Sequence, residues 1–254
     1  MEFASDENHG RVRERTASIV GSRGLVPIAI WTPGDGQTSR HLVLVGHGAG
    51  GHKRQEYVTA LARGLVRRYD MAVVAMDGPV HGERRVNFSS SPSESTLPFL
   101  EFVQVWSNDE TLTNNMVDDW HRVLDEVLVR DEFSDIVNVG YWGLSMGTIL
   151  GLPFVASEPR IKACVLGLMG LTGPTRERIA VDAPAIVIPT MFLVQWDDEL
   201  FARDDAFSLF DRLGASDKQL IATPGRHGDV TNENFHRSGD FLADRLGKAE
   251  NLTK

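Results

Sequence analysis

The most constraining feature of this chain is the pattern Gly-Leu-Ser-Met-Gly at residues 143–147. It follows an apolar run, residues 136–142, that predicts a strand, and it precedes a helix-compatible run, residues 148–156. A chain that turns from strand to helix within so few residues is crowded on both sides of the turn, which favours glycine there. Ser145 at the apex would be lifted clear of the sheet, with the amide of Met146 at a helix N-terminus.

Short apolar runs separated by helix-length segments recur through the rest of the chain. They are residues 42–45, 72–75, 136–139, 163–168, 190–194 and 219–222. Continuous apolar strands that alternate with helices are typical of a mostly parallel sheet with helices on both faces, so we predict the α/β fold class. Residues 16–20 and 25–31 predict an opening hairpin. The clearest predicted helices cover residues 109–130 and 229–246, and a third begins near Arg203.

The length and composition are those of one large core. A chain of 254 residues with 42% hydrophobic residues commonly folds as one domain, which we expect over residues 16–250 after a polar leader at 1–15. Residues 84–107 break the alternation and contain several aromatic side chains that would be poorly placed in water. We expect a lid insertion there, and a solvent-exposed linker is the alternative interpretation.

The charge and the cysteine content exclude some classes of partner and favour one compartment. A net charge of −9 and a pI near 5.4 disfavour nucleic acid and anionic membranes as general partners. We see no secretory signal and no apolar run long enough for a membrane helix. The single cysteine, Cys164, lies in an apolar run and fits a reducing compartment, so we expect a cytoplasmic protein. The sequence leaves the oligomeric state open.

A serine nucleophile requires a histidine base and an acid that orients it, and both could follow later strands. The apolar run 191–196 is followed by Asp-Asp-Glu at residues 197–199, and the run 220–224 is followed by Gly-Arg-His-Gly at residues 225–228. His227 is the candidate base because it follows the last predicted strand and has flanking glycines. A serine that caps a helix and an acidic helix start are the alternative interpretations of Ser145 and of residues 197–199.

A second glycine-rich loop, Gly-His-Gly-Ala-Gly-Gly at residues 46–51, follows the predicted strand 42–45. Its small side chains would let main-chain amides approach an oxyanion. The same residues match the G-x-G-x-x-G pattern of dinucleotide-binding units, so an NAD(P)-dependent oxidoreductase is an alternative. That alternative leaves Ser145 and His227 unexplained, and Asp77 lies farther beyond the loop than the usual spacing of about 20 residues.

Together these motifs resemble the α/β-hydrolase superfamily and, more loosely, its dienelactone-hydrolase-like and small bacterial esterase branches. The resemblance covers residues 16–246 and implies an α/β-hydrolase fold with a triad in the order Ser145, Asp198, His227. Many relatives have a Gly-x-x-Asp acid loop, and Gln195 stands at the glycine position here. That alignment selects Asp198 as the acid and keeps residue 197, also aspartate, as the alternative.

The resemblance also implies the two main-chain donors that would bind an oxyanion. In relatives they belong to the residue after His-Gly, here Ala49, and to the residue after the nucleophile, here Met146. Residues 77–84 partly resemble an Asp-x-x-Gly-His-Gly-type loop of the superfamily. This implies an architectural role, rather than a catalytic one, for Asp77 and His81.

The activity implied is that of a serine hydrolase that cleaves a carboxylic ester, or a related thioester or lactone, through an acyl-enzyme. It needs no cofactor and no metal, and its expected partner is a small-molecule ester. Dienelactone hydrolases use cysteine where this chain has Ser145, which argues against lactone chemistry of that type. A lyase or cyclase on the same fold, and a non-hydrolytic ligand-binding protein, are the alternatives.

Four residues of the expected lid are candidate substrate contacts. Phe99, Phe102 and Trp106 would bury a short or medium acyl chain, and Arg84 would meet a polar leaving portion at the rim. We therefore expect small, soluble esters to be preferred over long-chain lipids. The alternatives are that Arg84 and Arg85 are solvated surface charges and that the aromatic residues belong to the core.

Overall fold

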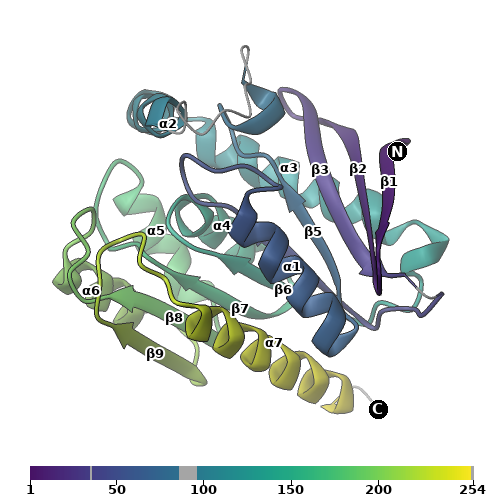
Figure 1. The fold of residues 1–254 in the computed structure, drawn as a ribbon. Coiled ribbons are helices and arrows are strands. Elements are labelled where there is room, and N and C mark those ends of the chain that lie inside the picture. Colours follow the sequence, from purple (N-terminus) through teal and green to yellow (C-terminus); the bar gives the residue numbers. More distant parts are fainter. Residues whose placement is uncertain (35, 86–95, 253–254) are drawn as a thin grey trace. The chain divides into compact units, whose positions relative to one another are not determined.

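The computed structural model describes residues 1–34, 36–85 and 96–252. The chain divides into two compact units, Met1–Val137 and Asn138–Lys254, each with its own strands and helices (Figure 1). That both belong to a single domain stays a prediction. Residues 86–95 of the expected lid lie outside the described residues.

The first unit contains a mostly antiparallel group of strands. Its strands are β1 (Phe3–His9), β2 (Val12–Gly21), β3 (Gly24–Pro33), β4 (His41–Gly46) and β5 (Ala72–Met76), in the order β1-β2-β3-β5-β4. Among these five described strands, β4 and β5 pair in parallel and the other neighbours pair antiparallel. The predicted hairpin is confirmed as β2 and β3. The prediction of a separate polar leader at 1–15 is wrong, because β1 lies in this segment and pairs with β2. The sequence did not reveal β1, because an edge strand with few buried side chains can be polar and then shows no apolar pattern.

Helices cover both faces of these strands. They are α1 (Glu56–Tyr69), α2 (Thr96–Asn108) and α3 (Leu112–Leu128), with short 3₁₀ turns η1 (Gly82–Arg84) and η3 (Asp131–Phe133). Successive residues of β2 point to opposite faces. Glu14 pairs with Arg63 of α1, whereas Arg15 pairs with Glu132 of η3, so α1 and the segment that follows α3 lie on opposite faces (Figure 1).

The predicted helix at 109–130 is confirmed as α3, but it starts three residues later than expected. In the sequence, Ser107 and Glu110 have the spacing of a capping box. That box is not formed, because Ser107 belongs to α2 and its hydroxyl donates to the carbonyl of Val103 (2.7 Å). Thr111 stands at the N-cap and makes no side-chain capping bond. Amphipathic spacing therefore located the helix, whereas the local capping pattern did not locate its first turn.

The second unit is a four-stranded parallel group in chain order. Its elements are β6 (Asn138–Gly143), α4 (Met146–Ser157), β7 (Ile161–Gly167), α5 (Arg176–Asp182), η4 (Ala183–Ala185), β8 (Thr190–Gln195), α6 (Arg203–Arg212), β9 (Lys218–Thr223) and α7 (Asn232–Leu252). Every strand pairs in parallel with the next. The four apolar runs predicted as strands here are confirmed, with bounds shifted by at most a few residues.

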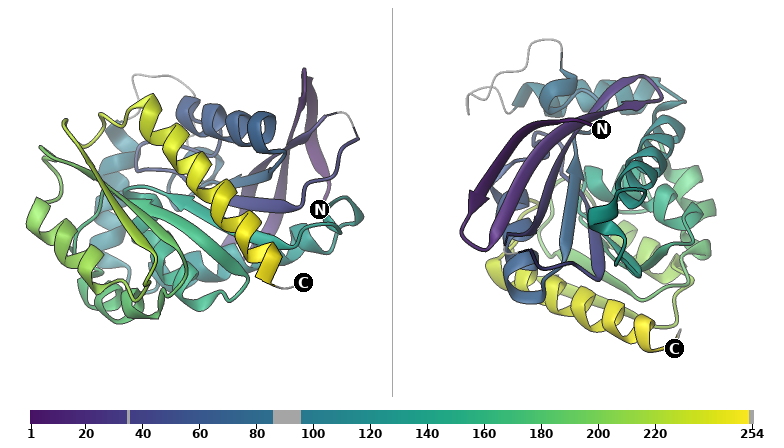
Figure 2. Two further views of the ribbon diagram at one scale, coloured as in Figure 1. Left: turned by 90° about the horizontal axis from the view of Figure 1, so that it is seen from below. Right: turned by 90° about the vertical axis from the view of Figure 1, so that its right-hand side faces the viewer.

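Helices α4 and α7 lie on opposite faces of this parallel group. Gly140 of β6 faces α7, because a Cβ there would lie 3.2 Å from the Leu246 side chain. The next residue, Tyr141, points the other way and donates to the carbonyl of Gly147 in α4 (2.7 Å). Figure 2 shows α7, in yellow, running across the strands of this unit. The unit therefore has the alternating strand–helix layers that the sequence predicts.

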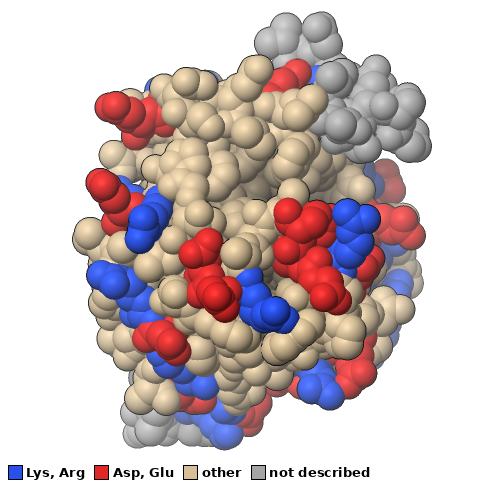
Figure 3. All heavy atoms as spheres, turned by 90° about the vertical axis from the view of Figure 1, so that its left-hand side faces the viewer, with Lys and Arg blue, Asp and Glu red and all other residues tan. Residues whose placement is uncertain are grey.

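The surface and the helices give two further observations. On the face that Figure 3 draws, acidic and basic side chains are interspersed among neutral ones. In the parts of the chain that the structure describes, no helix combines the length and the apolar character needed to cross a membrane.

Candidate active site

Ser145 lies at the sharp turn between β6 and α4, in a strained backbone conformation with φ 57° and ψ −119°. The flanking glycine is required sterically, because a Cβ on Gly143 would lie 2.7 Å from the carbonyl oxygen of Gly147. The turn is tied to the end of β7, since the N–H of Ser145 donates to Gly167 (3.0 Å). The hydroxyl of Thr148 lies 2.8 Å from the Gly143 carbonyl and accepts the Gly167 N–H (2.9 Å). The chain therefore holds the serine at the carboxyl end of the parallel strands.

His227 follows β9 in a tight loop that places its ring against the serine. Gly225 has φ 130°, and a Cβ there would lie only 2.8 Å from that of Asp229. The loop closes on itself because Arg226 N–H donates to the Asp229 carboxylate (2.8 Å) and Asp229 N–H donates to the Arg226 carbonyl (2.9 Å). His227 Nε2 lies 2.9 Å from Ser145 Oγ, and the imidazole is only 14% exposed. The predicted base and nucleophile are thus within hydrogen-bond distance.

Asp198 follows β8 and completes this chain of hydrogen bonds. Its Oδ2 lies 2.8 Å from His227 Nδ1, and its Oδ1 accepts the N–H groups of Leu200 (2.8 Å) and Phe201 (3.0 Å). Burial alone would raise the pKa of Asp198, but the hydrogen bonds from His227 and the two amides outweigh it and lower the pKa. An ionised Asp198 holds the proton of His227 on Nδ1, which leaves Nε2 free to accept the serine proton.

The neighbouring carboxylates are placed differently from Asp198. Asp197 is exposed, and its contact with the histidine loop is made by its main chain, whose N–H donates to the Gly225 carbonyl (3.0 Å). Glu199 Oε2 accepts the main-chain N–H of His227 (2.9 Å), a contact that the sequence did not reveal. Only the acidic run at 197–199 could have drawn attention to Glu199, and the two residues lie too far apart in the chain for spacing to pair them.

The two main-chain amides predicted to bind an oxyanion belong to Met146 and Ala49. Met146 is the first residue of α4, so its N–H has no partner within the helix. On the loop after β4, Gly48 N–H donates to the Tyr57 hydroxyl (2.7 Å) and Gly50 N–H donates to His81 Nε2 (2.9 Å). The N–H of Ala49 between them has no acceptor among the described residues. Of these three consecutive amides, the one at Ala49 is therefore left available to a ligand.

Two buried histidines fix this loop. His47 accepts the N–H of Gly78 at Nε2 (2.9 Å), and its Nδ1 donates to the Gly48 carbonyl (2.8 Å). His81 uses Nδ1 to donate to the Pro79 carbonyl (2.7 Å) while its Nε2 accepts from the loop. Burial lowers the pKa of His47 to about 4 and that of His81 to about 3, so both rings are neutral at pH 7. These contacts agree with the architectural role expected of His81.

Asp77 is likewise part of the supporting structure of the first unit. The carboxylate is fully buried and accepts the Lys53 N–H (2.8 Å), the Lys53 ammonium (2.8 Å) and the Glu83 N–H (2.9 Å). Lys53 lies in the loop after β4, and Asp77 and Glu83 lie in the segment after β5. Asp77 therefore stabilises those two loops against each other, as expected for a structural residue.

The candidate substrate contacts of the expected lid are more buried than predicted. Phe102 is 2% exposed, with its ring 5.9 Å from that of His81 and stacked on Trp106 at the same distance. Phe99 is half-buried. Arg84 pairs with the buried carboxylate of Asp119 (2.9 Å), so its guanidinium is engaged within the unit. That these residues contact a substrate stays a prediction.

The alternative for the two arginines, solvated surface charge, is wrong. The side chain of Arg84 is 11% exposed and that of Arg85 is 9% exposed. Arg85 makes a two-pronged pair with Glu101 of α2 (3.0 and 3.1 Å). The sequence offers no local sign of this, because both carboxylate partners lie more than a dozen residues away.

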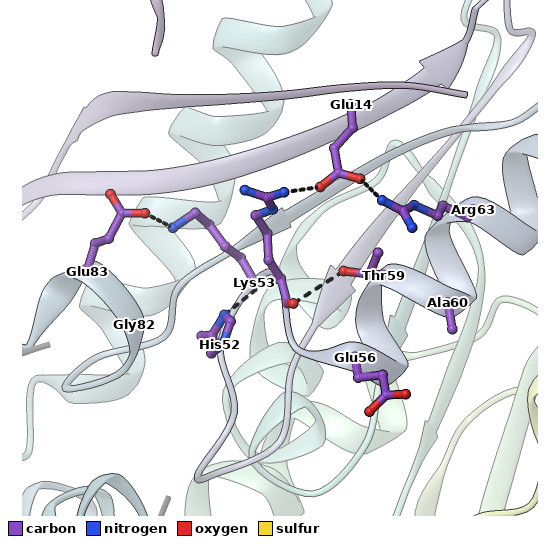
Figure 4. Close-up of a pocket in the computed structure, with 10 residues that line it drawn as sticks. Glu14, His52, Lys53, Glu56, Thr59, Ala60, Arg63, Gly82 and Glu83 are labelled. Carbon is purple, nitrogen blue, oxygen red and sulfur yellow. Dashed lines mark hydrogen bonds and ion pairs between the residues drawn. The ribbon is translucent and has the colours of Figure 1, made fainter. Parts of the chain in front are cut away.

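The first unit also contains a cavity of about 590 Å³ (Figure 4). It is lined by Glu14, His52, Lys53, Arg54, Glu56, Thr59, Ala60, Arg63, Gly82 and Glu83. The buried Glu14 carboxylate bridges Arg54 (2.8 Å) and Arg63 (2.9 Å), and Lys53 pairs with Glu83. The charges of the lining are thus largely neutralised by one another. Among the residues described, no group of three or more His, Cys, Asp or Glu side chains is arranged to hold a metal ion.

Comparison with known proteins identifies similar folds. No protein-family model matches the chain, and no curated protein does. Among solved structures, a cold-adapted esterase from an Arctic intertidal metagenomic library is 37% identical, with 97% of this chain and 100% of that one covered and a TM-score of 0.84. An acetyl xylan esterase from Paenibacillus sp. R4 is 16% identical over 95% and 87% of the two chains, with a TM-score of 0.71. A dienelactone hydrolase from Anabaena variabilis is 16% identical over 94% and 99%, with a TM-score of 0.66.

Proposed function

Because this chain belongs to the α/β-hydrolase superfamily and is a carboxylic ester hydrolase, we propose that it cleaves its substrate through an acyl-enzyme on Ser145. The observation that carries the proposal is the unbroken chain of hydrogen bonds within the second unit. Ser145 Oγ lies 2.9 Å from His227 Nε2, and His227 Nδ1 lies 2.8 Å from Asp198 Oδ2. This is the geometry that converts a weakly nucleophilic hydroxyl into an attacking alkoxide.

In the proposed reaction, His227 first accepts the proton of Ser145 as Oγ attacks the ester carbonyl carbon. The tetrahedral intermediate then collapses, the bond to the alcohol oxygen breaks, and protonated His227 gives its proton to that alcohol. His227 next removes a proton from water, which attacks the carbonyl carbon of the acyl-enzyme. The second tetrahedral intermediate then collapses, the bond to Ser145 Oγ breaks, protonated His227 returns its proton to that oxygen, and the carboxylic acid is released. Asp198 stays ionised throughout and stabilises the imidazolium that forms twice in the cycle.

We assign the stabilisation of the oxyanion to the main-chain amides of Met146 and Ala49. The Met146 amide is supported by its place at the N-terminus of α4, where the helix dipole favours negative charge. The Ala49 amide is supported by its neighbours, since the amides of Gly48 and Gly50 are already engaged, by the Tyr57 hydroxyl and by His81 Nε2. Loss of one such donor typically costs about 10²-fold to 10³-fold in kcat.

For the substrate we propose a small to medium, soluble ester. The support comes from the chemical class of the similar proteins and not from contacts with a substrate. The similar structures are esterases, and one of them is named an acetyl xylan esterase. A lyase, a cyclase or a non-hydrolytic binding protein is not favoured by these similarities. The proposal includes a cytoplasmic location, which the burial of the one thiol, Cys164, supports because such a thiol fits a reducing compartment.

The test is active-site labelling with a fluorophosphonate, followed by turnover of p-nitrophenyl esters from acetate to palmitate. We expect one label per chain on Ser145, a burst of p-nitrophenol, and highest kcat/KM for the short esters. Ser145→Ala should fold normally, take up no label and lose at least about 10³-fold in kcat/KM. Wild-type turnover by that variant would refute the assignment of the nucleophile, and best activity on palmitate would refute the substrate class.

A further inference from the structure

The acid loop provides two consecutive carboxylates to the same histidine, and only the first has a place in the reaction above. Asp198 binds the imidazole at Nδ1 (2.8 Å), whereas Glu199 Oε2 accepts the main-chain N–H of His227 (2.9 Å). The other oxygen of Glu199 lies 3.4 Å from the guanidinium of Arg226. The side chain of Glu199 is 41% exposed, so it meets solvent on one side and the histidine loop on the other.

The histidine loop needs an external contact at this point. His227 stands between Arg226 and Gly228, with Gly225 one residue further back, and glycines leave the main chain free to rotate. The internal bonds of the loop join Arg226 to Asp229 and do not include the histidine. The N–H of Asp197 holds the loop two residues earlier, at the Gly225 carbonyl (3.0 Å), and the ring of His227 contacts Asp198, the serine hydroxyl and the ring of Phe201 (5.7 Å between centroids). The bond to Glu199 differs from these contacts because it acts on the main chain of His227 itself.

We propose that Glu199 is a positioning residue that fixes the main chain of His227 and so holds Nε2 in line with Ser145 Oγ. The inference rests on the proposed function, in which His227 is the base. The hydrogen bond from His227 N–H, together with weaker effects that include the Arg226 charge, lowers the pKa of Glu199, so the carboxylate is ionised at neutral pH. Its negative charge next to the histidine also favours the imidazolium that forms when His227 takes the serine proton.

Three variants separate the hydrogen bond from the charge. Glu199→Ala removes both, Glu199→Gln keeps an oxygen that can accept the N–H but removes the charge, and Asp197→Asn removes one charge from an exposed neighbour. We expect Glu199→Ala to lower kcat about tenfold, with KM within about twofold and an unchanged melting temperature, because a small displacement of the base slows chemistry more than binding. Glu199→Gln should recover kcat to within about threefold of wild type. Asp197→Asn should match wild type.

The second readout is the acidic limb of the pH profile of kcat/KM, which reports the ionisation of the free base. We expect this midpoint to move to lower pH in Glu199→Gln, because the negative charge is lost while the geometry is kept. A wild-type kcat in Glu199→Ala would overturn the proposal. So would a Glu199→Gln variant as slow as Glu199→Ala with the wild-type pH midpoint, since neither geometry nor charge would then account for the loss.

A fluorophosphonate separates this inference from the proposed function. If wild-type protein takes up no label and hydrolyses no ester, the proposed function fails. If wild type is labelled and active while Glu199→Ala is labelled at the wild-type rate, only the inference about Glu199 fails. We expect labelling of Glu199→Ala to be slowed about as much as its kcat, because attack of Ser145 Oγ on phosphorus, which expels fluoride, depends on proton removal by His227 as attack on an ester does.

Discussion

Acidification should destabilise this protein well above the pH at which its carboxylates take up protons, because His47 and His81 are buried as neutral rings. Each ring uses Nε2 to accept a main-chain N–H, from Gly78 and Gly50 respectively. A proton on Nε2 would remove that acceptor and leave a charge in the interior. Burial therefore lowers the pKa of His47 to about 4 and that of His81 to about 3, against an ordinary value of 6.5.

The size of the effect follows from the difference in proton uptake between the unfolded and folded chains. Both pKa values are lowered on folding, so the stabilisation is complete above pH 6.5 and is lost as the pH falls toward 4 and 3. Each histidine then contributes about 1.4 kcal/mol per pH unit below 6.5. Between pH 7 and pH 5 the free energy of unfolding should fall by about 2 kcal/mol for each ring, or about 4 kcal/mol in all. The free energy of unfolding of a folded domain is only about 5–15 kcal/mol, so this loss is a large part of it.

The assay is urea unfolding at pH 7, 6 and 5, with nitrogen-detected NMR of the imidazole rings at the same pH values. His47→Gln is the matched variant: whatever its stability at pH 7, its loss between pH 7 and 5 should be about 2 kcal/mol smaller than that of wild type. The NMR spectra should show both rings as neutral Nδ1–H tautomers throughout. A loss below about 1 kcal/mol in wild type, or rings that titrate above pH 6, would refute the argument.

Two further variants test the triad and the lid segment. Asp198→Asn should lower kcat at least about 100-fold, because Asp198, unlike Asp197, bonds to the His227 ring through its side chain. Asp197→Asn should keep kcat within about twofold of wild type. Steady-state ester hydrolysis measures both variants, and the reverse ranking would transfer the role of the acid to Asp197. Phe102→Ala should lower the free energy of unfolding by about 3–5 kcal/mol, because the ring is 2% exposed and lies on His81. Denaturant melts measure it, and a stable variant with altered acyl-length preference would instead show a pocket residue.

The sequence predicted those features that depend on local patterns. From Leu42 onward in β4, and throughout β5, the residues are apolar or glycine because both faces are covered, and such runs are visible without any structure. The turn around Ser145 was equally visible, since glycine is forced by the close approach of Gly143 to the start of α4. Strand β1 was missed because its side chains remain largely exposed and impose no alternation of polar and apolar residues.

Contacts between distant residues were not predictable in the same way. The sequence placed Asp198 and His227 at strand ends, but it could not show that Glu199 reaches the main chain of that histidine. The buried pairing of Arg84 with Asp119 was also hidden, because arginine in a polar segment is usually exposed. In both cases the partner is fixed by how the strands and helices pack, which no short motif records.

The conformation of Ser145 has a consequence for how this protein tolerates change. A side chain at φ 57° and ψ −119° carries strain of about 1–3 kcal/mol, which glycine at the same position would not carry. The folded state would thus gain stability from losing its nucleophile. Stability therefore favours glycine at residue 145, whereas catalysis requires serine. A screen for stability alone would select inactive chains with glycine at this position. Alanine there would keep the strain and lose the activity.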